Sequence, residues 1–115
     1  MHALFIVLND LSYLDQVLKT LVELKVRGAT ILESEGMAKA VLKSEGLNML
    51  LEGIIKSNQT KDVGSSKTIF TVIPDYQDID KIVSKVREVL THSEKNVIGF
   101  MFTVPVTNIY PIKKH

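Results

Sequence analysis

The residues with the clearest potential for ligand chemistry are Gly36, Met37 and Ala38, a small-residue step that follows a predicted strand. Small residues let a backbone approach a phosphate closely, and successive backbone N–H groups can then bind its oxygens. The step could equally be a plain strand exit without a ligand. Residue types alone favour the plain exit.

Few other residues have the types or the spacing that catalysis requires. The sequence has no cysteine, which excludes thiolate zinc sites, iron–sulfur clusters and thiol nucleophiles. His2, His92 and His115 are isolated from one another, and His92 is expected just past a helix end. Neither the G-x-x-x-x-G-K-[ST] nor the G-x-G-x-x-G phosphate motif is present. The sequence therefore predicts a protein that is not an enzyme and has no metal centre.

Length and charge limit the classes of partner. A chain of 115 residues is expected to form one domain over residues 1–115. With 14 basic and 13 acidic residues the net charge is +1, so we expect no nucleic-acid partner. No apolar run approaches the ~20 residues of a membrane span, and the first residues lack the basic region of a signal peptide. We therefore expect a cytoplasmic protein.

Hydrophobic spacing predicts the elements that must position the candidate residues. Ser12 with Asp15 resembles a capping box for the first helix, and Asp75 or Asp78 is expected to cap the second. In chain order we predict a strand at 3–8, a helix at 14–24, a strand at 29–34, a strand at 67–73, a helix at 79–90 and a strand at 97–104.

This order of elements is that of an α+β, ferredoxin-like βαββαβ sandwich with an antiparallel sheet. Both helices would cover one face of that sheet. The first strand carries apolar residues on both faces, with Leu4, Ile6 and Leu8 on one and Phe5 and Val7 on the other. The second face therefore needs a cover, and oligomerisation is the simplest one for so small a domain.

The connection between the second and third strands, at about 37–66, is too long for a hairpin loop. Leucine and isoleucine at helical spacing predict a short amphipathic helix at 47–55, which could be core or could bind a partner. Residues 57–66 are polar and contain glycine, which is typical of a mobile loop.

Residues 21–38, LVELKVRGATILESEGMA, resemble the motif L-x-E-x-G-[IV]-x-G-x-T-x-x-E-x-x-G-x-G. This motif is similar to that of the PII signal-transduction proteins and their PII-like relatives, the nitrogen regulatory protein PII superfamily. Lys25 and Ala38 stand where the family usually has glycine. The matching positions are Leu21, Glu23, Val26, Gly28, Thr30, Glu33 and Gly36.

The resemblance implies a PII-like homotrimer with a regulatory role. An adenine nucleotide, a small anionic ligand, would bind in clefts between the subunits. The connection at 37–66 would be a T-loop-like insertion that contacts a target protein such as a transporter. The expected ligand-binding residues, taken from matched positions or as nearby cations, are Thr30, Gly36, Met37, Ala38, Lys39 and Lys95, with Lys43 as a further cation.

Three departures indicate a divergent member of that family. The family's phosphate-wrapping stretch T-G-x-x-G-D-G-K-I-F corresponds here to residues 91–100, where only Thr91 and Phe100 match. The family's two arginines after the fourth strand have no counterpart in residues 104–110, and the long connection has no tyrosine for uridylylation. Some PII-like relatives of this kind bind other adenine ligands, including cyclic dinucleotides.

Two alternatives from other functional classes stay open. A CutA-type metal-tolerance trimer would share the fold, but it needs clustered histidine, cysteine or carboxylate ligands. A small ferredoxin-like enzyme such as an acylphosphatase needs a loop arginine and a positioned asparagine. Arg27 and Arg87 are the only arginines, and neither lies in a glycine-rich loop.

Overall fold

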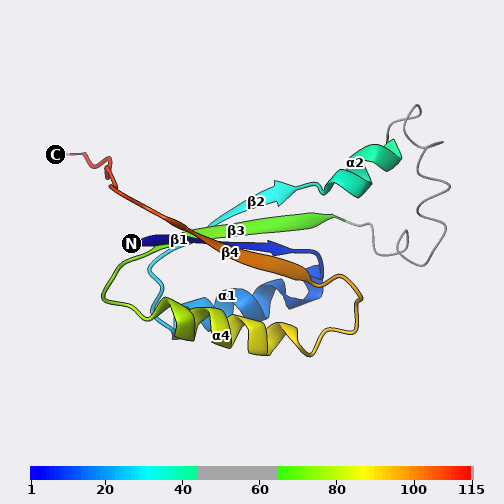
Figure 1. The fold of residues 1–115 in the computed structure, drawn as a ribbon, viewed down its shortest axis with the longest axis horizontal. Helices are drawn as coiled ribbons and strands as arrows, with labels where there is room; N and C mark the ends of the chain where they lie inside the picture. Colours follow the sequence, from blue (N-terminus) through cyan, green and yellow to red (C-terminus); the bar gives the residue numbers. More distant parts are fainter. Residues whose placement is uncertain (44–64, 115) are drawn as a thin grey trace.

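The computed structural model describes residues 1–43 and 65–114. Its strands are β1 (His2–Leu8), β2 (Thr30–Ser34), β3 (Ser66–Ile73) and β4 (Gly99–Pro105). Its helices are the short 3-10 helix η1 (Leu11–Tyr13), α1 (Leu14–Glu23), α2 (Met37–Lys43) and α4 (Ile79–Leu90). The strands form one antiparallel sheet in the order β2-β3-β1-β4, and α1 and α4 pack side by side on one face of it (Figure 1). The predicted α+β, ferredoxin-like fold is confirmed.

The core lies between the sheet and the two long helices. Alternate residues of β1 and β3 point toward the helices, which in turn bury one side chain per turn toward the sheet. In α4 the buried positions are four residues apart, so they lie on one helix face. The buried apolar residues are Leu4, Ile6, Leu8, Val17, Leu21, Ile69, Ile73, Ile82, Val86 and Leu90.

The opposite face of the sheet is apolar and has no covering element among the described residues. Phe5 of β1 stands opposite Phe70 of β3 and Phe102 of β4, and its ring stacks on both at centroid distances of 5.8 and 4.8 Å. We call this surface the open face; it consists of Phe5, Phe70, Val72, Phe100, Phe102 and Val104. Phe100 and Phe102 remain 59% and 43% exposed. An exposed aromatic row of this kind marks an interaction surface.

The two long helices start differently from each other. Asp78 caps α4 as predicted, because its carboxylate accepts the N–H of Lys81 at 3.2 Å. The predicted capping box of Ser12 and Asp15 is wrong, since α1 has no side-chain cap. The Asp10 carboxylate instead accepts the N–H of Ser12 and caps the preceding η1 turn. A short polar side chain that follows a strand readily makes such a local turn.

The helix α2 was not predicted. The residues from Met37 onward were expected to belong to the long connection, but the first seven of them are helical. They are methionine, alanine, lysine, valine and leucine, mostly strong helix formers. The predicted helix at 47–55, and residues 44–64 of the T-loop-like insertion, lie outside the described residues. In the described part of the chain, no helix is long and apolar enough to cross a membrane.

Candidate functional site

The candidate residues after β2 lie on a strand-to-helix step. Gly36 lies between β2 and α2, and its carbonyl accepts the N–H of Ala40 at 3.0 Å. A Cβ placed on Gly36 would meet no atom within 4 Å, so free space adjoins this stretch of backbone. Met37 is 83% exposed, and Ala38 follows it in the first turn of α2. The step is therefore an accessible surface at the edge of the sheet.

Hydroxyl groups hold together the two ends of the long connection. The Ser34 and Ser66 Oγ atoms are 2.8 Å apart, and the Ser66 hydroxyl also donates to the Ser34 carbonyl at 2.9 Å. The Lys39 ammonium donates to the Ser65 hydroxyl at 3.1 Å. These bonds fix the base of the connection at the sheet and keep one cation beside it.

The loop between α4 and β4, residues 91–98, is held by a buried carboxylate at the end of β1. Asp10 is only 5% exposed. Its Oδ1 accepts the Ser12 hydroxyl, and its Oδ2 accepts the Ser93 hydroxyl, both at 2.6 Å. The backbone N–H groups of Asn9 and Asp10 donate to the Ile98 carbonyl at 2.9 and 3.2 Å. The position of the loop therefore depends on Asp10.

Hydrogen bonds also set the charge state of this carboxylate. The donor hydroxyl of Ser12, and after it that of Ser93, lower the pKa of Asp10 below its ordinary value, while burial works in the opposite direction. Asp10 is thus ionised in the folded protein near neutral pH. Lys95, the candidate cation of this loop, lines a hollow of about 440 Å³ together with Asp10, Tyr13 and His92.

The candidate ligand-binding residues do not lie close together within one subunit. Thr30 begins β2 and Gly36 follows its end, so the two residues are separated by the length of that strand, roughly 13 Å at ~3.3 Å per residue. Lys95 precedes β4, the strand at the other edge of the sheet from β2. Two strands lie between those edges, a separation of roughly 14 Å at ~4.8 Å per strand step. Within one subunit these residues are therefore spread over both edges and both ends of the sheet.

The sequence profile of the family described as Nitrogen regulatory protein P-II matches residues 1–115. The chain belongs to the P-II family. No curated protein matches the sequence. The fold is similar to that of Arabidopsis thaliana PII in a crystal structure with bound citrate, with a TM-score of 0.61 and 14% identity. That alignment covers 92% of this chain and 77% of the Arabidopsis chain.

Lys25, which stands where the motif usually has glycine, has a left-handed backbone conformation. Its φ is 64°, in the left-handed region. The N–H of Lys25 donates to the Val22 carbonyl and the N–H of Val26 to the Leu21 carbonyl, each at 3.0 Å. These two bonds form the Schellman closure that ends a helix. Lys25 therefore occupies a position at the helix end that would suit glycine better.

Residues 91–100 also depart from the P-II pattern but remain ordered by contacts of their own. The glycines of the family stretch are absent from their positions. The loop is held instead by the hydrogen bond from the Ser93 hydroxyl to the Asp10 carboxylate. The N–H of Lys95 donates to the Ser93 hydroxyl at 3.2 Å. His92 lies just past α4, as expected. Within residues 1–43 and 65–114, no three histidine or carboxylate side chains converge as a metal site.

Sequence reasoning missed the role of Asp10. The spacing of Asp10 and Ser12 directly after a strand is a signal for a side-chain turn that the predictions above did not use. The bond to Ser93 had no such signal, because the partner is 83 residues away in the sequence.

Proposed function

We propose that this P-II family protein is a non-catalytic regulator that works as a homotrimer. In this proposal the chain is one domain, cytoplasmic, with a T-loop-like insertion at about 37–66. A small anionic ligand, in the first place an adenine nucleotide, binds in the clefts between subunits. Binding orders the insertion and so changes the surface that a target protein meets.

The observation that supports this proposal is the division of the candidate residues between two edges and two ends of the sheet. Thr30 of one subunit and Gly36 of the next can meet at one ligand, whereas the same pair within a subunit is too far apart. Lys39 and Lys95 then supply positive charge for phosphate groups. The similar Arabidopsis PII binds citrate, which is also a small anion.

The open face supports the homotrimer. Its phenylalanine rings are already stacked on one another, so an approaching subunit would meet a preordered apolar surface. Burying Phe100 and Phe102 removes apolar area from water, which is worth about 25 cal/mol per Å². Three copies that place this face toward a common axis would cover it on every subunit.

A thermal-shift screen against ATP, ADP, AMP, cyclic AMP and cyclic di-AMP tests the ligand class. A ligand that binds only the folded protein raises the melting temperature, by about 2.7 kcal/mol of stability at 100 times its Kd. We expect one adenine nucleotide to raise it clearly. If none of the five does so at saturating concentration, the nucleotide assignment is wrong.

A β-branched side chain at Gly36 tests the position of the site. Gly36→Val fills the free space beside the backbone and should abolish the nucleotide response. Ala40→Val places the same side chain one helical turn further along α2 and should leave the response unchanged. Unaltered nucleotide affinity in the Gly36 variant would remove this step from the site.

A further inference from the structure

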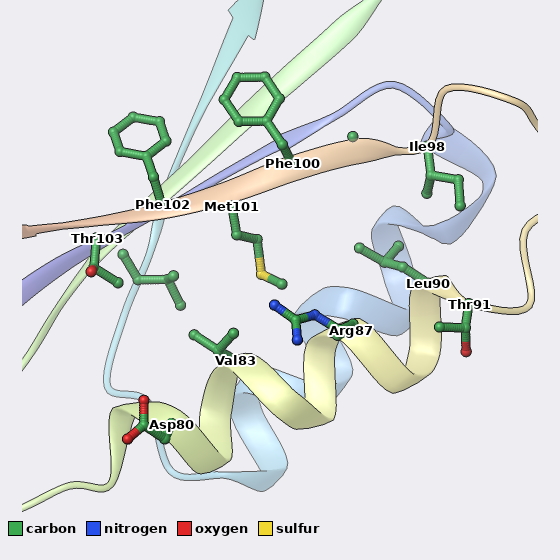
Figure 2. Close-up of a pocket in the computed structure, with 12 residues that line it drawn as sticks. Asp80, Val83, Arg87, Leu90, Thr91, Ile98, Phe100, Met101, Phe102 and Thr103 are labelled. Atoms are coloured by element: carbon green, nitrogen blue, oxygen red, sulfur yellow. The ribbon is translucent and has the colours of Figure 1, made fainter.

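A second hollow lies between α4 and the edge strand β4, on the helix side of the sheet (Figure 2). Its volume is about 560 Å³, within the range of small-molecule sites. Val83 and Leu90 of α4 form one wall, and Met101 of β4 forms the other. Leu4, a fully buried core residue, also lines it. We call this hollow the α4–β4 groove.

Arg87 is the one cationic residue among the described residues that line the α4–β4 groove. Figure 2 shows its guanidinium extending from α4 into the gap toward β4, below Met101. Among the described residues no carboxylate forms an ion pair with it. Asp80, the acidic lining residue, lies two helical turns away, roughly 10 Å along the axis at ~1.5 Å per residue.

An arginine in these surroundings favours a ligand that carries a carboxylate. The guanidinium offers five N–H donors in a planar fork that matches a carboxylate, and it cannot lose its charge. The aliphatic walls on either side favour an apolar body next to that carboxylate. One cation beside an apolar wall therefore complements a molecule with one anionic end and a hydrocarbon remainder.

We propose that the α4–β4 groove binds an apolar monocarboxylate, such as a medium-chain alkanoate. The carboxylate accepts two hydrogen bonds from the Arg87 guanidinium, and the alkyl chain lies against Val83, Leu90 and Met101. The groove is at the β4 edge on the helix side of the sheet, and Phe100 and Phe102 of the open face contribute to its rim. It is thus separate from the Gly36 step, and this inference does not depend on the nucleotide assignment.

Titration with sodium octanoate, below the concentration at which it forms micelles, tests the proposal. Binding is followed by NMR on protein with ¹³C-labelled methionine methyl groups, because Met101 lines the groove. We expect a saturable shift of the Met101 methyl signal. 1-Octanol, which has the same chain without the charge, should bind at least about tenfold more weakly.

Two variants separate the charge from the apolar wall. Arg87→Gln keeps much of the side chain and removes the charge. Its affinity for octanoate should be at least about tenfold lower than that of the wild-type protein. Lys85→Gln removes a cation from the exposed side of the same helix, where it pairs with Glu88 at 3.7 Å, and should not change binding. Arg87 is exposed, so its variant should fold normally.

Three results would overturn the proposal. The first is no saturable octanoate binding by the wild-type protein in the millimolar range. The second is equal affinity of the wild-type and Arg87→Gln proteins, which would mean that the charge is not recognised. The third is saturation without a shift of the Met101 signal, which would place the ligand elsewhere. A failed nucleotide screen on the same sample would leave all three readouts unaffected.

Discussion

Replacing Lys25 with glycine should stabilise the protein by about 1 kcal/mol. Lys25 has a φ of 64°, and a left-handed conformation costs a residue with a Cβ about 1–2 kcal/mol. Glycine removes that cost, but its greater freedom in the unfolded chain returns about 0.4–1 kcal/mol. The Schellman bonds involve only backbone atoms, so they are kept. A net gain of about 1 kcal/mol corresponds to a rise in melting temperature of roughly 4 °C for a domain of this size.

Two control variants separate the backbone effect from loss of the side chain. Lys25→Ala removes the same charge and the side chain beyond Cβ but keeps the Cβ and with it the left-handed strain, so it should not stabilise. Lys19→Gly places glycine in the exposed interior of α1 and should destabilise by about 1 kcal/mol. Urea unfolding at one fixed protein concentration gives all three free energies, because association would otherwise shift the apparent stability. If Lys25→Ala stabilises as much as Lys25→Gly, the explanation from φ is wrong.

Other substitutions have equally definite expectations. Gly99→Ala should cost roughly 3 kcal/mol or more in urea unfolding, because its Cβ would overlap the Val7 carbonyl oxygen at a φ of 150°. Gly28→Ala, with no atom within 4 Å of the added carbon, should stay within about 1 kcal/mol of wild type. The pKa of Asp10 is lowered in the folded protein, so this carboxylate stabilises the fold above its unfolded pKa of about 3.9 and ceases to do so as pH falls through the lower folded value. Asp10→Asn should lower the free energy of unfolding by about 2 kcal/mol at neutral pH, and this difference from wild type should shrink as the pH falls. An equal pH dependence of the unfolding free energy in wild type and variant would contradict this role of Asp10. Phe102→Glu, on the open face, should reduce the light-scattering mass to that of a monomer, whereas a trimeric variant would refute the packing proposal.

The parts of the fold that could be predicted are those whose burial pattern is local. In β1 alternate residues are buried, and in α4 the buried residues are four apart, so both elements follow from neighbouring letters of the sequence. The same holds for Asp78, whose capping partner is three residues away. The motif at residues 21–38 was also sufficient for the family, which the match over residues 1–115 confirms.

The remaining features depend on contacts between distant residues or on weak local signals. Asp10 and Ser93 meet only because the loop after α4 returns to the end of β1. The residues of α2 are mostly strong helix formers, and helical propensity alone is a weak guide to secondary structure. Arg87 has an ordinary place in the sequence of α4, and only its position opposite β4 puts it in a groove. The candidate ligand residues stay a prediction.

The serine pair at the end of β2 and β3 has a consequence for how the protein could be altered. Hydrogen bonds between Ser34 and Ser66 hold the two ends of the long connection together at the sheet. In general, each doubling of the length of a loop with fixed ends costs only about 0.6 kcal/mol. Foreign segments, including a fluorescent domain whose own termini are close together, could therefore be grafted between these serines. If ligand binding orders the insertion as we propose, a chain modified in this way would report that binding as an optical signal.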